Sequence, residues 1–223
     1  MSAMELDPVQ QRVLGCLLEK QRTTPDAYPL TLNGLRLACN QTTNRDPVTA
    51  YSEAEVRTAL QRLGERRLTR LASGPGSRAP KYRHLLDETL GLRANEQALL
   101  SVLLVRGPQT LGELKQRSER VHEFPDLSAV EATVSRLTDR ELGRWLERRP
   151  GQKEARYAHL LGGEAPRGAA VEAAGARATP AVDAASDARG EREALADELE
   201  DVRRELATLR DEVAQLRRRL SSA

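Results

Sequence analysis

Among the 223 residues of this sequence, two histidines have a type and position that could suggest catalysis. His84 and His159 each follow a tyrosine by two positions and precede a Leu-Leu pair. Neither has a companion carboxylate or cysteine pattern, and a hydrolase site would need such partners. Because the two histidines occupy equivalent places, we expect both to face the inner surface of a β-hairpin. We predict that the chain is not an enzyme.

The two cysteines, Cys16 and Cys39, could in principle bind a metal or take part in redox chemistry. They lack the close pairing of a zinc knuckle, and two residues are too few for a disulfide framework. Both lie among leucines at helical spacing, where a free thiol behaves as a small hydrophobic side chain. The glycines at 74 and 76 lie between two expected strands and do not open a helix, so they do not form a phosphate-binding loop. We predict core packing for the cysteines and no metal, cofactor or catalytic site.

Arginine and lysine side chains give the stronger functional signal. Residues 1–86 hold 13 Lys+Arg against 8 Asp+Glu, residues 87–161 hold 12 of each, and residues 162–223 hold 10 against 13. A polyanion would therefore meet the first third of the chain. The cations that we expect to hold DNA phosphates are Arg57, Arg62, Arg66, Arg67, Arg78, Lys81 and Arg83.

An internal repeat indicates which elements position these cations. Residues 81–86 return 75 positions later as residues 156–161, with the Tyr-x-His-Leu-Leu motif in both. Apolar residues at i, i+4 and i+7 also return, as Val56, Leu60 and Leu63 in the first copy and Val130, Val134 and Leu137 in the second. Each copy predicts three helices followed by a two-stranded hairpin, with a capping box at Ser52 opening the third helix. This arrangement is a winged helix, a variant of the helix-turn-helix.

The predicted fold class is α+β, mainly α with small β-hairpins, in two tandem winged-helix domains at residues 1–86 and 87–161. Residues 162–190 contain 11 Ala, 5 Gly and 2 Pro among 29 positions, and we expect a flexible linker there because they can bury little apolar surface. Residues 191–223 predict a coiled-coil helix. No run reaches the roughly 20 apolar residues of a membrane span, and the start lacks a signal peptide, so we expect a cytoplasmic protein.

Several motifs of the first 161 residues resemble the YceH-like family of bacterial proteins. The motifs that carry the resemblance are Leu17-Leu18-Glu19-Lys20-Gln21, Thr23-Thr24-Pro25-Asp26, Tyr28-Pro29-Leu30, Ala38-Cys39-Asn40-Gln41, Thr43-Asn44-Arg45, Gln109-Thr110 and Gly112-Glu113-Leu114. The resemblance covers about residues 5–161 and implies a tandem winged-helix fold. It implies no biochemical activity, so function depends on the residues themselves.

The third helix of the first copy leaves open whether its exposed face binds DNA. Helical spacing at 100° per residue turns Val56, Leu60 and Leu63 inward and leaves Thr58, Gln61 and Glu65 outward. Gln61 suits a base edge, whereas Glu65 would repel phosphate. The alternatives are a protein-docking surface and a basic surface that is simply solvated.

A polar insertion lies directly before this helix in the first copy and is missing from the second. It carries Asn40, Gln41, Asn44 and Arg45. Amides can pair with adenine and arginine with guanine or phosphate, so these side chains are candidates for the residues nearest the bases. The alternative is structural: Asn40 ends a helix, and residues 44–47 form a turn.

The C-terminal segment carries an unbroken heptad pattern. Its apolar seam is Leu195, Leu199, Val202, Leu206, Leu209, Val213, Leu216 and Leu220. Glutamates at g and arginines at e would pair between chains in a parallel homodimer and would repel in an antiparallel one. Leucine at both seam positions also permits a trimer, and a single amphipathic helix folding back on its own chain is a further alternative.

The leading interpretation is a non-enzymatic protein that binds double-stranded DNA through its first domain, in gene regulation or chromosome organisation. The excess charge of +5 in residues 1–86 favours it. The runner-up is a protein-interaction adaptor within a larger complex. It is favoured by the scarcity of aromatic residues, six in all, and by the centre of the third helix, which is not basic.

Overall fold

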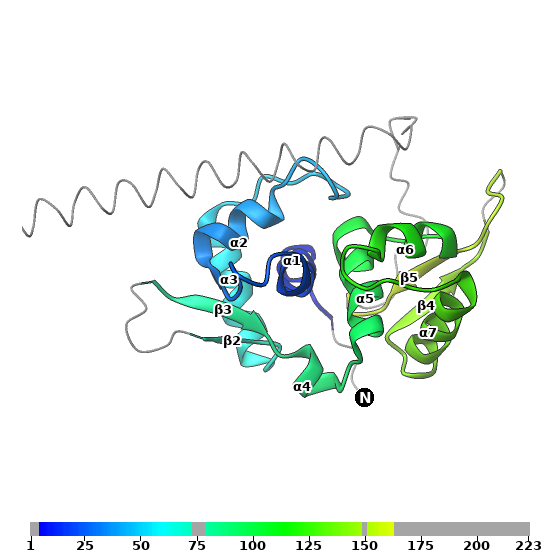
Figure 1. The fold of residues 1–223 in the computed structure, drawn as a ribbon. Coiled ribbons are helices and arrows are strands. Elements are labelled where there is room, and N and C mark those ends of the chain that lie inside the picture. The colour runs from blue at the N-terminus through cyan, green and yellow to red at the C-terminus, as the bar shows by residue number, and fades with distance from the viewer. Residues whose placement is uncertain (1–4, 73–78, 149–150, 163–223) are drawn as a thin grey trace, which may run out of the picture. The chain divides into compact units, whose positions relative to one another are not determined.

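The computed structural model describes residues 5–72, 79–148 and 151–162 (Figure 1). The fold is α+β, with helices and small antiparallel sheets, as the sequence predicts. Arg78, most of the expected linker and the whole heptad segment lie outside the described residues. No helix in the described ranges is long and apolar enough to cross a membrane.

The first half of the described chain forms three main helices and one sheet. Its elements in order are α1 (Pro8–Thr23), β1 (Leu30–Thr31), α2 (Leu32–Cys39), α3 (Glu53–Glu65), β2 (Thr69–Leu71) and β3 (Lys81–His84). The three strands are antiparallel and lie in the order β1-β3-β2. The two-residue strand β1 was not expected from the sequence.

Local sequence signals explain where α1 and α3 begin. Asp7 caps α1 by accepting a hydrogen bond from the Gln10 backbone amide at 2.9 Å, and Pro8 follows in the first turn, where its missing N–H costs nothing. Ser52 caps α3, and Glu55 bonds back to the Ser52 amide, so the predicted capping box is present.

The second half repeats this order with one strand reduced to a bridge. Its elements are the short α4 (Leu86–Leu90), α5 (Ala94–Arg106), α6 (Leu111–Ser118), α7 (Leu127–Asp139), β4 (Gly143–Leu146) and β5 (Arg156–His159). Strands β4 and β5 form an antiparallel pair, and Gln109 bridges Tyr157 of β5 through backbone hydrogen bonds. Gln109 therefore occupies the place that β1 has in the first half.

Helices α1 and α5 pack against each other where the two halves meet (Figure 1). Gly15 permits this close approach, because a Cβ there would lie 2.7 Å from Leu104 Cβ and 2.8 Å from Val105 Cγ1. Buried residues from Leu6 to Leu161 belong to one continuous hydrophobic core. Experiments on the first half are therefore best made in the full chain, since truncation would expose the α1 surface.

The described start and end of the chain are also joined. The Leu6 amide donates to the Leu161 carbonyl at 2.8 Å, and Glu5 bridges Gly162. The Gln11 side chain donates to the Leu6 carbonyl at 2.7 Å. Residues 5–7 thus connect the end of the second half to the N-terminus of α1.

Candidate nucleic-acid interface

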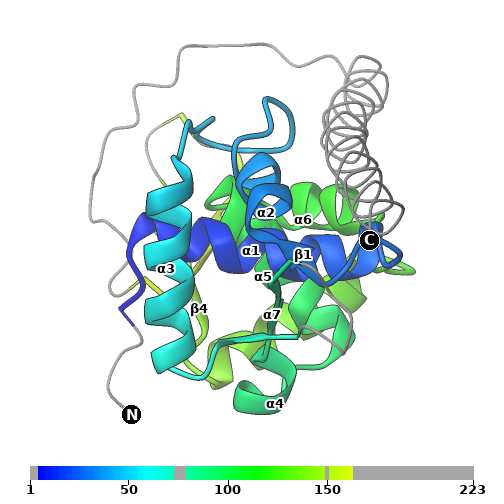
Figure 2. The same ribbon diagram turned by 90° about the vertical axis from the view of Figure 1, so that its left-hand side faces the viewer.

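Helix α3 presents an outer face that carries both cations and polar groups. Val56, Leu60 and Leu63 are buried, as the sequence predicts, and α3 lies in front of α1 in Figure 2. On the outer side Gln61 and Glu65 are exposed. The Thr58 hydroxyl donates to the Ala54 carbonyl at 2.9 Å, within the helix itself. Gln61 is therefore the residue at the centre of this face best suited to a base edge.

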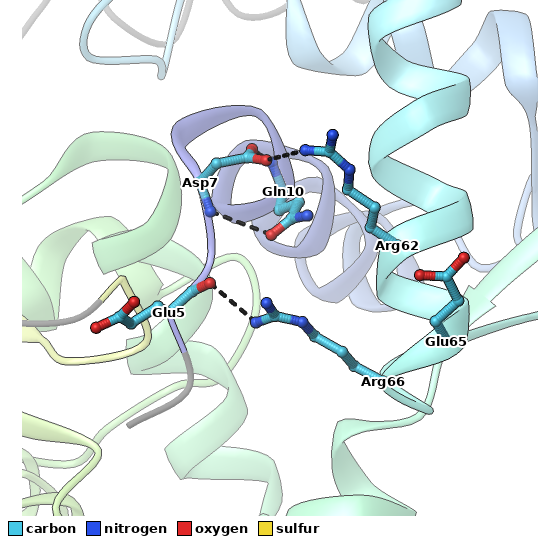
Figure 3. Close-up of a pocket in the computed structure, with 6 residues that line it drawn as sticks. All are labelled: Glu5, Asp7, Gln10, Arg62, Glu65 and Arg66. Atoms are coloured by element: carbon cyan, nitrogen blue, oxygen red, sulfur yellow. Dashed lines mark hydrogen bonds and ion pairs between the residues drawn. The ribbon is translucent and has the colours of Figure 1, made fainter. Parts of the chain in front are cut away.

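Arg62, near the end of α3, and Arg66, directly after it, extend toward residues 5–7 (Figure 3). Arg62 Nη1 lies 3.4 Å from Asp7 Oδ2, and Arg66 Nη1 donates to the Glu5 carbonyl at 2.9 Å. With Gln10 and Glu65 these residues line a pocket of about 430 Å³. Its three carboxylates against two guanidinium groups make the pocket itself a poor anion site.

The contact of Arg62 with Asp7 is nevertheless easily exchanged. The Arg62 side chain is 60% exposed and that of Asp7 39% exposed. Ion pairs between exposed groups contribute only about 0 to 1 kcal/mol. A DNA phosphate could therefore replace the carboxylate of Asp7 at low cost, leaving Arg62 available as a phosphate contact.

The remaining cations of the predicted set lie along α3 and the adjacent strand. Arg57 is exposed and pairs with Glu53 one turn earlier, and Arg83 on β3 pairs with Glu88. Arg67 is exposed just after α3, with a positive φ of 57°. Lys81 is half-exposed at the start of β3. The structure therefore brings these cations onto neighbouring elements, α3 and the β2–β3 hairpin.

The polar insertion before α3 is different, because its side chains hold the loop together. The side-chain Nδ2 of Asn40 donates to the Tyr51 carbonyl at 2.8 Å, and its Oδ1 accepts from the Tyr51 backbone amide at 2.8 Å. Gln41 Oε1 accepts from Arg45 Nη2 at 2.7 Å. Asn44 is half-buried with a φ of 58°. Asn40 caps the C-terminus of α2, as the structural alternative expects. The base-reading role predicted for Asn40 and Gln41 would need side-chain groups that are already hydrogen-bonded within the loop.

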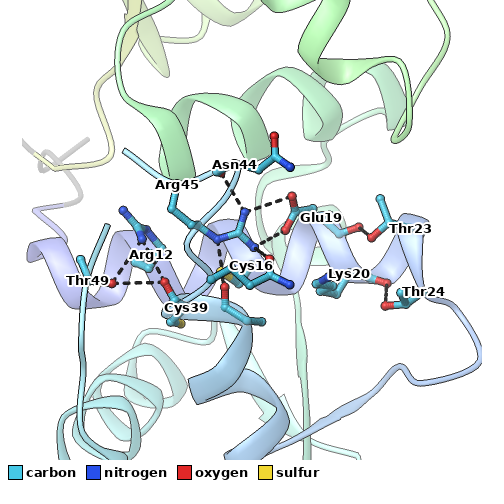
Figure 4. Close-up of polar contacts among 12 residues, drawn as sticks. Arg12, Cys16, Glu19, Lys20, Thr23, Thr24, Cys39, Asn44, Arg45 and Thr49 are labelled. Atoms are coloured by element: carbon cyan, nitrogen blue, oxygen red, sulfur yellow. Dashed lines mark hydrogen bonds and ion pairs between the residues drawn. The ribbon is translucent and has the colours of Figure 1, made fainter. Parts of the chain in front are cut away.

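The expectation that Arg45 lies near the DNA bases has to be corrected, because its side chain lies inside the protein with 0% exposure. Its Nη2 lies 2.6 Å from Glu19 Oε2, and its Nε donates to the Ala38 carbonyl at 2.9 Å (Figure 4). Burial alone would raise the pKa of Glu19, but the charge of Arg45 holds it below its usual value. Arg45 anchors the insertion to α1 and α2 and cannot contact DNA without leaving these partners.

A second buried arginine, Arg12, was not singled out from the sequence. Its Nη1 donates to the Cys39 carbonyl at 3.0 Å (Figure 4). Its Nη2 donates to the Pro47 carbonyl at 2.7 Å. The available signal was its position on α1, one turn before Cys16 on the apolar stripe. Together, Arg12 and Arg45 attach the loop before α3 to α1.

Of the two histidines of the repeat, His84 is buried and His159 is half-buried. His84 is fully buried, with Nε2 2.7 Å from Gln21 Oε1 and Nδ1 accepting from the Leu86 amide at 3.3 Å. Burial lowers the pKa of His84 to about 4 and that of His159 to about 4. Both rings are therefore neutral near pH 7.

These depressed pKa values predict a stability that falls as the solution becomes acidic. Below pH 6.5 His84 and His159 become protonated in the unfolded chain, whereas in the folded chain they stay neutral until about pH 4. Stability is complete above pH 6.5, and we expect a loss of about 2 kcal/mol per histidine between pH 6.5 and 5. Urea unfolding of the full chain at a series of pH values measures this loss.

The matched variants are His84→Gln with His159→Gln, and His122→Gln as control. His122 is half-exposed and packs edge-on against Phe124. The double variant should have a flatter pH dependence between pH 5 and 6.5, whereas the control should keep the full slope. Identical slopes in all three proteins would contradict the assignment.

Taken together, the geometry defines an α+β protein whose third helix and neighbouring hairpin expose arginines and a lysine. The chain belongs to a family described as a protein of unknown function, DUF480, whose model matches residues 6–152. Family membership was predicted from the sequence motifs and is confirmed.

Relatives from several bacteria share most of the chain. A UPF0502 protein of Geotalea uraniireducens is 51% identical over 184 residues, covering 82% of this chain and 81% of the relative. A UPF0502 protein of Geobacter sulfurreducens is 53% identical over 161 residues, covering 71% and 73%. One from Pseudomonas aeruginosa is 51% identical over 179 residues, covering 79% and 80%.

Proposed function

We propose that this protein is a non-enzymatic tandem winged-helix protein that binds double-stranded DNA through α3 and the β2–β3 hairpin. The element order α1-β1-α2-α3-β2-β3, with strands in the order β1-β3-β2, supports a winged helix in the first half. The same helix order in the second half, with the Gln109–Tyr157 bridge in place of β1, supports a second copy.

The observation that carries the DNA proposal is the exposure of Arg57 and Arg62 on α3, whose other face is buried, and of Arg66 directly after the helix. In helix-turn-helix proteins the corresponding helix enters the major groove, and basic side chains at its borders contact phosphates. Lys81 and Arg83 on the adjacent strand β3 would contact the backbone beside that groove. Gln61 is the residue that we assign to base contact.

The proposed biological setting is gene regulation or chromosome organisation by a parallel homodimer. The heptad segment of residues 195–220 would join two chains and place two copies of α3 on one DNA. Two linked binding sites gain effective concentration without any new contact.

The direct test measures binding of the full chain to a fluorescently labelled DNA duplex of mixed sequence. Fluorescence anisotropy gives the affinity at each of several rising salt concentrations. Each neutralised phosphate reduces log K by about 0.9 per log unit of salt. We expect log K to fall with log salt with a slope of about −3 to −5 for each chain bound. The cations that would give this slope are Arg57, Arg62, Arg66, Lys81 and Arg83. No binding at about 50 mM salt, where phosphate contacts are strongest, would sink the DNA proposal.

Removing the charge of Asp7 should strengthen DNA binding. The substitution Asp7→Asn retains the helix cap, because asparagine caps as well as aspartate, and it releases Arg62. Since an exposed pair contributes at most about 1 kcal/mol, we expect affinity to rise by about two- to fivefold.

Asp139→Asn on α7 is the matched control, because it changes net charge equally in the second half. It should raise affinity by less than Asp7→Asn. An equal gain in both variants would mean that Asp7 acts only through net charge and not through Arg62.

Protein docking is the second candidate function, and the second half offers one observation for it. Leu127 at the start of α7 is 50% exposed, and Trp145 on β4 is 42% exposed. Tryptophan is enriched in protein interfaces relative to the rest of the surface. Recovery of partners from native cells with and without nuclease separates the candidates, because DNA-bridged partners disappear with nuclease and directly docked ones remain.

A further inference from the structure

The outer face of the β1-β3-β2 sheet carries two arginines side by side. Side chains alternate along a strand, so Lys81 and Arg83 of β3 lie on one face, while Tyr82 and the buried His84 lie on the other. Strands β2 and β3 form the hairpin in Figure 1, and their antiparallel register places Arg70 directly opposite Arg83. Side chains of directly opposite residues share a face, so the Arg70 and Arg83 side chains are neighbours on the outer face.

The ion pairs of the described residues compensate only one of these two charges. Arg83 pairs with Glu88, whose side chain is 52% exposed. Arg70 is exposed and forms no ion pair or hydrogen bond with another described residue. Like charges at opposite positions destabilise a strand pair, because their Cβ atoms are only about 4.5 to 5.5 Å apart. An additional anion beside Arg70 and Arg83 would relieve this repulsion.

The second half does not repeat the arginine pair. Strands β4 and β5 are also antiparallel, and there Arg144 lies opposite Ala158. Alanine thus takes the place of Arg83 in the second copy, 75 positions later in the sequence. The paired cations belong to the half of the chain whose net charge is +5.

Two adjacent arginines suit a phosphate group in particular. A guanidinium group is planar and presents paired N–H donors, which match two oxygens of one phosphate. A phosphate is tetrahedral, so a second arginine can bind its other oxygens from another side. The hydrogen bond with Glu88 uses one of the five N–H donors of Arg83. Arg83 can therefore contact a phosphate while it stays paired with Glu88.

We propose that Arg70 and Arg83 form a phosphate-binding site on the outer face of the β2–β3 hairpin. The phosphate group belongs either to the DNA backbone or to a free phosphorylated molecule, because the two arginines recognise chemistry that both share. Where the phosphate is that of DNA, the site rests on the proposed function and adds Arg70 to the contact already assigned to Arg83. Glu88 limits the affinity of the site, since it competes for Arg83.

The first measurement titrates the full chain with inorganic phosphate at fixed pH and constant ionic strength, and follows the phosphorus NMR signal. Arg70→Gln should weaken phosphate binding by about tenfold, because it removes one of two charge-assisted contacts. Glu88→Gln should strengthen binding by about two- to fivefold, because it removes the competing carboxylate of a partly exposed ion pair. The matched control is Arg148→Gln, which replaces an exposed arginine of the second half and should leave the affinity unchanged.

The second measurement repeats the DNA anisotropy titration with Arg70→Gln and identifies the source of the phosphate. If log K falls less steeply with log salt, by about 1, the phosphate is that of the DNA backbone. An unchanged slope, with phosphate binding weakened in the first measurement, assigns the site to a free phosphorylated molecule. Failure of the unaltered chain to bind DNA would remove the DNA proposal but not the site, because the first measurement needs no DNA.

Equal phosphate affinities in the unaltered chain, Arg70→Gln and the Arg148→Gln control would overturn the site. The gain expected for Glu88→Gln is an independent check, because a loss of folding cannot increase binding. An unchanged or lower phosphate affinity in Glu88→Gln would contradict the assignment of Arg83 to the site.

Discussion

Replacing Arg62 and Arg66 together by alanine should weaken DNA binding by about a hundredfold at low salt. Each charge-assisted hydrogen bond to a phosphate contributes about 1.5 kcal/mol or more, which is about tenfold in affinity. The dependence of log K on log salt should become less steep by about 2, because two fewer phosphates are neutralised. Anisotropy titrations of the full chain at several salt concentrations measure both changes.

The loss should be similar on duplexes of different sequence, because phosphate contacts carry no sequence information. By contrast, Gln61→Ala should change the relative affinity for different duplexes more than the average affinity. The matched control removes two exposed arginines of the second half, Arg120 and Arg148. If the control loses as much affinity and slope as the Arg62/Arg66 variant, α3 is not the DNA-binding element.

The inner face of α3 and the helix caps could be predicted because their signals are local. Val56, Leu60 and Leu63 have helical spacing and are buried, and the Ser52–Glu55 box closes within one turn. The hairpin motif ending at His84 was visible from its repeat at His159. Periodicity and capping depend on residues three or four apart, so a single sequence contains the whole signal.

Other features depend on partners that are distant in sequence. Strand β1 has two residues, too few for an alternating pattern, and it exists because it pairs with β3. Arg45 lies in a polar stretch that predicts exposure. It is buried because it forms an ion pair with Glu19, which lies 26 residues earlier on α1. The hydrogen bond from the Cys16 thiol to the Ala38 carbonyl likewise forms only when α1 and α2 pack.

Residues 5–7 show why a list of cations overstates the charge available to DNA. Arg62 and Arg66 face Asp7 and the Glu5 carbonyl, so each must exchange a partner within the chain for a phosphate. These same residues join the end of the second half through Leu161. The N-terminal segment therefore connects the second half to the proposed DNA-binding face, although it carries no basic residue in the described range.

The buried pair of Arg45 and Glu19 should contribute far more to stability than any exposed pair on α3. We expect Arg45→Ala to lower the free energy of unfolding by about 3 to 5 kcal/mol, because it leaves the Glu19 carboxylate without its cation and removes the anchor of the loop. The matched control, Arg57→Ala, breaks the exposed pair with Glu53 and should cost less than about 1 kcal/mol. Urea denaturation of both variants at pH 7 measures the difference.

A double variant separates the charge effect from the lost packing. Arg45→Met with Glu19→Leu removes both charges and replaces them with apolar side chains, and we expect it to recover part of the stability lost in Arg45→Ala. Recovery would mean that the unpaired carboxylate causes much of the loss, and no recovery would assign the loss to the hydrogen bonds with Ala38, Gln41 and Asn44. A cost for Arg45→Ala no larger than that for Arg57→Ala would contradict the buried position of Arg45 and restore it as a candidate contact to DNA.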